Sequence, residues 1–222
     1  MGEEAQTLKQ SLKLPIAFVL LLWGIHLIEV LSDEELAAFM GILPRQAEGL
    51  LGIVTFPLIH GGWGHLSSNS LPLIILGTAI LFFYRPIALR SIAFIYLLHG
   101  ALVFLAARPV THIGASGLVY GFAAFLLTSG ILRRERSLIA LSMLVIFIYG
   151  GMIWGVLPIR EGVSWEGHLF GAIAGIAAAF YYRREGPQRT PYEWEQEDNL
   201  PETGVWDYRT HFPPPRHPDK EQ

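Results

Sequence analysis

A serine flanked by glycines, in the segment Gly114-Ala115-Ser116-Gly117, lies between two hydrophobic runs. Gly114 and Gly117 let the backbone turn tightly and leave its N–H groups open near the hydroxyl. A nucleophile needs this arrangement, because such donors can bind the oxyanion that its attack creates. Small residues also line ordinary contacts between membrane helices, so Ser116 indicates catalysis only together with other polar residues.

His168 is the candidate base for this serine. A serine hydroxyl is a weak nucleophile until a base takes its proton, and histidine titrates near neutral pH. No carboxylate is evident as a third member of this site. Glu166 lies only two residues before His168, and this spacing gives no clear geometric support for a contact between them. The sequence therefore predicts a Ser116–His168 dyad, with Tyr120 one helical turn after the serine, where its ring can support the imidazole.

The segment from His60 to Asn69 supplies further hydrogen-bond donors. His65 and Asn69 are four residues apart, so a helix would place both on one face, where both can donate to an oxyanion. His60 would keep this end of the molecule wet, and hydrolysis needs water. The five-residue spacing of His60 and His65, with no carboxylate nearby, lacks the H-E-x-x-H pattern. We therefore predict no metal and no other cofactor.

The elements that position these residues must be membrane helices. The 222 residues are 52% hydrophobic and 16% charged, and the mean hydropathy is +0.40. A soluble domain would carry about 25% charged residues. An all-α, polytopic membrane protein is therefore expected, embedded in the lipid bilayer. The absence of cysteine excludes a thiolate nucleophile, and the net charge of −3 with no basic domain argues against a nucleic-acid partner.

Hydrophobic runs divide the chain into a polar segment (1–13), a six-span domain (14–184) and a tail (185–222) rich in proline, acidic and aromatic residues, which we expect to be flexible. The predicted spans are 14–31, 67–84, 88–107, 115–132, 137–157 and 167–182. A capping-box pattern at Ser32–Glu35 predicts a short interfacial helix over 36–40. The basic residues place both termini in the cytoplasm of what we expect to be a bacterial cell.

The polar residues fall at one depth on spans two, four and six. Asn69, Ser116 and His168 lie about 16, 17 and 15 residues from the arginine that ends each span, which at ~1.5 Å per residue gives roughly 24, 26 and 22 Å. In a hydrocarbon core ~30 Å thick, all three occupy one layer below the outer surface. They form a site if the helices are adjacent.

Two pairs of glycines favour this adjacency. Gly117 and Gly121 are four residues apart on the fourth span, and Gly171 and Gly175 are four apart on the sixth. Such pairs let helix backbones approach closely in lipid. Close approach would bring the Ser116 hydroxyl within hydrogen-bonding reach of the imidazole.

Three motifs together resemble the rhomboid family of intramembrane serine proteases. They are His60-x4-His65-x3-Asn69, then Gly114-Ala115-Ser116-Gly117 with Tyr120 following, and His168-x2-Gly171-x3-Gly175. Each motif alone is weak, but three in order on alternate helices are highly specific. The resemblance covers 14–183 and leaves the tail outside.

The resemblance implies a rhomboid-like bundle with Ser116 as nucleophile and His168 as base. It implies His65, Asn69 and the Ser116 N–H as oxyanion donors, and a tyrosine ring packed on the imidazole. Its substrates would be transmembrane proteins, usually of one span, whose helix unwinds near the outer interface. The family's frequent Trp-Arg pair in the first outer loop is missing here. Only Arg45 lies near that position, which leaves the anchoring of the loop open.

These observations predict an endopeptidase that cleaves peptide bonds in or beside transmembrane segments through an acyl-enzyme. The alternative is a non-catalytic rhomboid-like protein that binds membrane helices, which would have no use for both Ser116 and His168. A small transporter is a third hypothesis. It would place ionisable residues near the midplane, whereas the middle of each predicted span is apolar.

Overall fold

The computed structural model describes residues 3–32, 36–159 and 164–189, and they form helices without a β-strand. In chain order the elements are α1 (Glu3–Ser32), α2 (Leu36–Met40), η1 (Ala47–Gly49), α3 (Gly52–Thr55), η2 (Phe56–Leu58), α4 (Trp63–Phe83), α5 (Ala88–Ala106), α6 (Ser116–Arg133), α7 (Arg136–Tyr149), η3 (Gly150–Val156) and α8 (Trp165–Tyr181). The η elements are short 3₁₀-helices. Residues 33–35 of the predicted capping box and the predicted tail beyond residue 189 lie outside the described residues.

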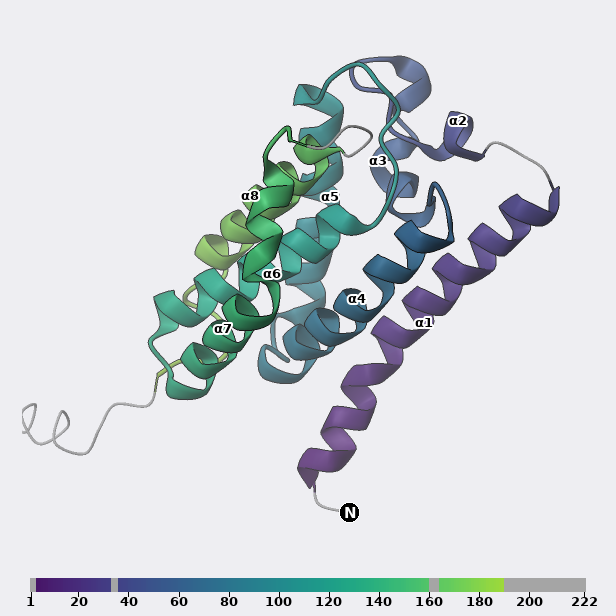
Figure 1. Cartoon of the computed structure of the whole chain (residues 1–222). Helices are drawn as coiled ribbons and strands as arrows, with labels where there is room; N and C mark the ends of the chain where they lie inside the picture. Colours follow the sequence, from purple (N-terminus) through teal and green to yellow (C-terminus); the bar gives the residue numbers. More distant parts are fainter. Residues whose placement is uncertain (1–2, 33–35, 160–163, 190–222) are drawn as a thin grey trace, which may run out of the picture. The chain divides into compact units, whose positions relative to one another are not determined.

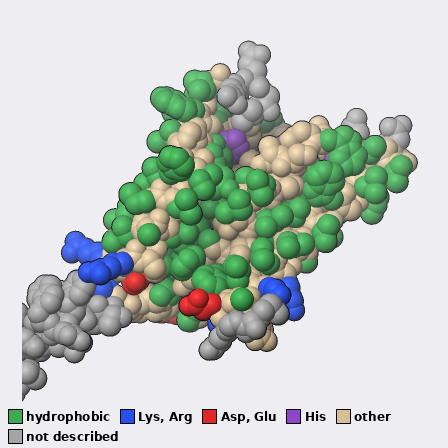
Figure 2. Space-filling view, turned by 60° about the horizontal axis from the view of Figure 1, so that its bottom comes forward, with side chains coloured by type: hydrophobic (Ala, Val, Ile, Leu, Met, Phe, Trp, Pro, Cys, Tyr) green, Lys and Arg blue, Asp and Glu red, His purple; other side chains and the backbone are tan. Residues whose placement is uncertain are grey.

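Five of the described helices are long and apolar enough to cross a membrane: α1, α4, α5, α6, and α7 continued through η3. Helix α8 has 17 residues, or ~25 Å, and runs beside α6 (Figure 1). Hydrophobic side chains cover the flank of the bundle, as Figure 2 shows, because lipid tails are as apolar as the side chains that face them. The predicted all-α membrane bundle is confirmed.

Several helix boundaries differ from the prediction, most of all in the first and fifth spans. The first helix begins at Glu3, not at residue 14, because residues 3–13 include good helix formers such as Ala, Leu, Lys and Gln. The fifth span is α-helical only to Tyr149 and continues as the 3₁₀-helix η3. The glycine pair Gly150-Gly151 at this junction has weak α-helix propensity, which favours the change.

Helix α1 lies along α4 in the opposite direction (Figure 1). Pro15 packs against Gly77, where a Cβ would lie 3.2 Å from the proline ring. Farther along, the indole of Trp23 donates to the Ser70 hydroxyl at 3.0 Å. These contacts fix α4, the helix that carries the predicted oxyanion donors.

Helices α6 and α8 pack in parallel through the two predicted glycine pairs. A Cβ on Gly171 would lie 2.0 Å from the carbonyl oxygen of Gly117, and one on Gly175 would lie 2.0 Å from that of Gly121. Any larger residue at these positions would push the two backbones apart. The close approach therefore sets the relative height of the two helices that carry Ser116 and His168.

The loop between α2 and η1 is anchored by Arg45, although the expected tryptophan is absent. The Arg45 guanidinium donates to the carbonyl oxygens of Leu105 and Ala107 at the C-terminal end of α5. The same loop pairs with the α5–α6 connection through two backbone hydrogen bonds between Ile42 and His112, at 3.0 and 2.8 Å. The anchoring that the resemblance left open is thus supplied by backbone acceptors.

At the opposite end of the bundle, Arg133 binds the chain that follows α8. Its guanidinium donates to the carbonyl oxygens of Tyr182, Glu185 and Pro187 at 2.6–2.8 Å. The guanidinium also lies 5.5 Å from the ring centre of Tyr84, at the end of α4. Residues 182–187 are therefore held against α6, and the predicted tail over 185–222 stays a prediction.

We expect the Arg133→Met variant to lower the free energy of unfolding by about 3 kcal/mol, because three charge-assisted hydrogen bonds to carbonyls are lost at once. Thermal unfolding of the purified protein in detergent measures this loss. Arg134→Gln is the matched control, because Arg134 is exposed and adjacent. An Arg133 variant as stable as this control would contradict the assignment.

Candidate active site

Ser116 and His168 meet at one end of the bundle. Ser116 is the first residue of α6, and His168 lies in the first turn of α8. The His168 Nε2 atom is 2.8 Å from the Ser116 Oγ atom. Because the glycine contacts hold α6 and α8 side by side, two residues far apart in sequence are brought within hydrogen-bonding distance.

The backbone carbonyl of Gly155 orients the imidazole. Its oxygen lies 2.8 Å from the His168 Nδ1 atom. A carbonyl can only accept a hydrogen bond, so Nδ1 carries the proton and Nε2 is left as an acceptor. The Ser116 hydroxyl therefore donates to His168 Nε2, in the tautomer that a general base requires.

The ring of Tyr120 stacks on the imidazole from α6. The two ring centres are 4.3 Å apart and the ring planes differ by 9°. The Tyr120 hydroxyl donates to the carbonyl oxygen of Met152 at 2.7 Å, which ties this ring to η3. The imidazole is thus held on one edge by Gly155 and on one face by the tyrosine.

The predicted oxyanion donors lie on the same cavity. Its volume is about 1180 Å³, and its lining includes His65, Asn69, Ser116 and His168. Asn69 is buried, and no group among the described residues accepts a hydrogen bond from its Nδ2 atom. Leaving a buried amide N–H₂ without a partner is unfavourable, so this group is available to donate to an acceptor that enters the cavity.

The turn before Ser116 brings the backbone close to His65 of α4 and to His60, which precedes that helix. Gly114 has φ +102°, and a Cβ there would lie 2.5 Å from the His65 ring. The His60 Nε2 atom faces the Ala115 N–H at 3.5 Å. Burial, with His65 nearby, lowers the pKa of His60 to about 4, so His60 is neutral near pH 7 and can accept this bond. Ser116 starts α6, where N–H groups lack a helical acceptor.

This geometry agrees with a comparison against known protein families. Residues 47–185 match the Rhomboid domain family. The chain belongs to the rhomboid family. The match covers the site, four of the five helices long enough to cross a membrane, and α8. Rhomboid proteins are usually intramembrane serine proteases.

Among curated proteins, this rhomboid is similar to proteins of mycobacteria that are themselves described as uncharacterized. One from Mycobacterium tuberculosis and one from Mycobacterium bovis are each 38% identical over 183 residues, covering 78% of this chain and 75% of theirs. One from Mycobacterium leprae is 36% identical, covering 78% of this chain and 71% of its own. The names of these relatives add no activity, and the family assignment rests on the match over residues 47–185.

Two polar contacts of the rhomboid domain were not predicted from the sequence. Glu166 forms a bidentate ion pair with Arg108, its Oε2 atom lying 3.0 Å from the Arg108 Nη2 atom. The Glu166 carboxylate therefore pairs with Arg108 and not with His168. Beside it, Ser164 donates to His112 Nδ1 at 2.7 Å and accepts from the Gly167 N–H at the start of α8. Burial lowers the pKa of His112, which keeps its ring neutral in this contact.

Gly155 is the other contributor to the rhomboid site that the sequence did not predict. Every residue has a carbonyl, so no residue type marks the one that orients a histidine. The one indication in the sequence was that this residue is a glycine. A Cβ at Gly155 would lie 1.9 Å from the Tyr120 hydroxyl and 3.2 Å from His168 Nδ1, so a larger residue would not fit there. Only the close approach of three elements, α6, α8 and η3, makes that signal meaningful.

Proposed function

We propose that this rhomboid is an intramembrane serine endopeptidase that hydrolyses peptide bonds in or next to transmembrane segments of membrane proteins. One observation carries the proposal: the hydroxyl of Ser116 donates to a His168 imidazole whose other nitrogen is fixed by a carbonyl. Neither a helix contact nor a binding surface requires this arrangement, whereas an activated nucleophile does.

In the proposed acylation step, Ser116 Oγ attacks the scissile carbonyl carbon and its proton passes to His168 Nε2. The new oxyanion receives hydrogen bonds from the Ser116 N–H, His65 and Asn69. The C–N bond then breaks, and the imidazolium gives its proton to the leaving amine. The acyl group remains on the serine as an ester.

In the proposed deacylation step, a water molecule takes the place of the amine. His168 removes one proton from the water as its oxygen attacks the ester carbonyl, and it returns a proton to Ser116 Oγ when the ester bond breaks. The cavity of about 1180 Å³ gives room for an unwound segment of chain beside the dyad. Its lining includes Ile148 and Trp154 from the α7–η3 span, which suits an apolar substrate.

The proposal places the cavity near the outer face of a bacterial cell membrane, with both termini in the cytoplasm. Lys and Arg side chains gather toward the end of the bundle opposite the cavity, as Figure 2 shows. An excess of basic residues marks the cytoplasmic side of a membrane protein.

Labelling the wild-type protein with a fluorophosphonate tests the proposed function. An activated serine attacks the phosphorus and stays covalently modified, and we expect mass spectrometry to place the adduct on Ser116. Ser164 and Ser68 also line the cavity and serve as internal controls that should stay unmodified. A protein that binds single-span helices but gives no adduct would be the non-catalytic alternative.

We expect Asn69→Ala to reduce kcat by about 10²–10³-fold with little change in KM, because one oxyanion donor is worth about 2.7–4 kcal/mol. Cleavage of a fluorescent single-span reporter protein in liposomes measures both constants. Ser67→Ala is the control, since Ser67 lies two residues earlier on α4 and is exposed. Equal kcat values for the two variants would remove Asn69 from the proposed site.

A further inference from the structure

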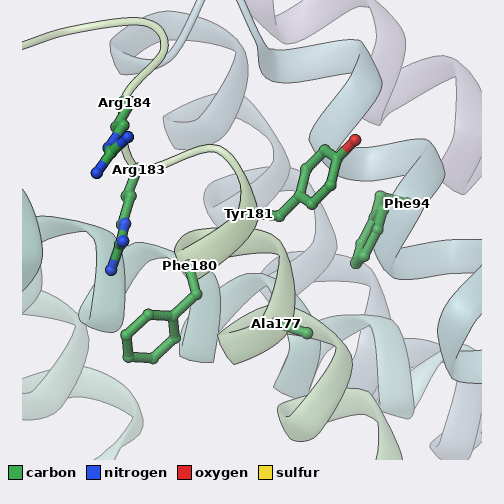
Figure 3. Close-up of a pocket in the computed structure, with 6 residues that line it drawn as sticks. All are labelled: Phe94, Ala177, Phe180, Tyr181, Arg183 and Arg184. Carbon is green, nitrogen blue, oxygen red and sulfur yellow. The ribbon is translucent and has the colours of Figure 1, made fainter.

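A second hollow lies at the end of the bundle opposite the dyad. It has a volume of about 670 Å³ and is lined by Phe94, Ala177, Phe180, Tyr181, Arg183 and Arg184. Figure 3 shows the two arginines on one side of this hollow, with Phe94 and Tyr181 on the other. The hollow, hereafter the basic groove, thus combines an apolar wall with a cationic rim.

The apolar wall of the basic groove is made of packed rings. Phe94 of α5 and Tyr181 of α8 stack with their centres 5.5 Å apart and their planes 20° from parallel. Behind them, Tyr182 contacts Phe94 edge-on, and the Arg90 guanidinium lies 5.6 Å from the Tyr182 ring centre. Rings held by such neighbours keep the wall in place.

The rim of the groove carries positive charge that the described part of the chain does not neutralise. Glu185 is the adjacent carboxylate, and it forms an ion pair with Arg90 at 2.9 Å. Arg183 and Arg184 are exposed, and neither forms an ion pair with a carboxylate within the described ranges. The groove is therefore complementary to an anion.

The backbone that carries these arginines is fixed. Arg133 donates to the carbonyl oxygens of Tyr182 and Glu185, immediately on either side of Arg183 and Arg184. The turn that ends α8 therefore cannot drift away from α6. Two cationic side chains are thereby presented at a defined height, beside the helix surface that faces lipid.

We propose that the basic groove binds an anionic phospholipid, with its phosphate at Arg183 and Arg184 and an acyl chain along Phe180 and Phe94. Guanidinium groups recognise phosphate through charge-assisted hydrogen bonds. Basic pockets between membrane helices suit lipid headgroups at the cytoplasmic surface. The aromatic wall favours a lipid over a free anion, because a free phosphate would leave that apolar surface in contact with water.

Native mass spectrometry of the full chain, released from detergent with added lipid, tests this site. Phosphatidylglycerol and phosphatidylcholine with identical acyl chains are the probes, and we expect retention of phosphatidylglycerol to be the stronger. The Arg183→Gln/Arg184→Gln variant should lower the occupancy of phosphatidylglycerol about five-fold or more, because each arginine near the lipid surface strengthens the binding of an anionic headgroup. Arg85→Gln/Arg134→Gln is the matched control, removing the same charge from exposed residues outside the groove.

A second variant tests the apolar part of the basic groove separately from its two arginines. Ala177→Phe places a larger side chain in the space of the groove and leaves both arginines in place. We expect it also to lower phosphatidylglycerol occupancy. Thermal unfolding checks that each variant remains folded. Equal losses in the two arginine pairs, or no preference for phosphatidylglycerol, would overturn the site. Displacement of the lipid by inorganic phosphate at millimolar concentration would show a free-anion site and would equally overturn the lipid assignment.

Discussion

The Ser116→Ala and His168→Ala variants should each cleave a single-span reporter at least about 10⁴-fold more slowly than the wild type, and the double variant should be no slower. The reason is the 2.8 Å hydrogen bond between Ser116 Oγ and His168 Nε2. A hydroxyl without its base and a base without its hydroxyl are equally unable to form the acyl-enzyme, so the two losses do not add. Rates in proteoliposomes with a fluorescent reporter measure the cycle.

Ser67→Ala is the control for this cycle, because it removes an exposed hydroxyl from the same end of α4. It should retain wild-type rates. Fluorophosphonate labelling gives a second readout, which Ser116→Ala should lose completely and His168→Ala should slow strongly. Losses that add in the double variant would mean that the two side chains act independently, and the proposed dyad would then be wrong.

The Gly155→Ala variant should lose about 10²-fold in kcat although it changes neither member of the dyad. A Cβ at this position would lie 1.9 Å from the Tyr120 hydroxyl and 3.2 Å from His168 Nδ1, so η3 must move away. The imidazole then loses the carbonyl that sets its tautomer, and a displacement of about 1 Å in a catalytic group can reduce the rate by this factor. Reporter cleavage and the rate of fluorophosphonate labelling should fall together.

Gly151→Ala provides the matched control within the same 3₁₀-helix, because a Cβ there meets nothing within 4 Å. Both substitutions add one methyl group to η3, and only the one at Gly155 would meet Tyr120 and His168. We expect Gly151→Ala to keep its activity and both variants to keep their thermal stability to within a few degrees. Similar activity losses in the two would point to a general loosening of η3 and away from the Gly155 carbonyl.

The contact between Ser116 and His168 could be predicted from the sequence because both are polar residue types in apolar surroundings. Ser116 and His168 had few structural reasons to lie at matching depth, and the glycine pairs on the same helices indicated which spans meet. The fold followed from hydrophobic runs whose length matches a bilayer. Family membership, predicted from three motifs, is confirmed by the match over residues 47–185.

Other features could not be predicted, because they depend on backbone atoms that look alike in every sequence. Gly155 acts through its carbonyl, and Arg45 anchors the first loop by binding the carbonyls of Leu105 and Ala107. Arg133 looked like an ordinary cytoplasmic arginine, yet it is buried and holds residues 182–187. Such contacts appear only when the helices are assembled.

The carbonyl partner of His168 has a further consequence for the enzyme that we propose. A carboxylate in that position would itself ionise, and its protonation would be coupled to that of the imidazole. A peptide oxygen has no proton to exchange at any accessible pH and cannot be deleted by exchanging a side chain. The acid limb of a rate profile should therefore follow the ionisation of a single group, and inactivating changes at this position must act by moving the main chain.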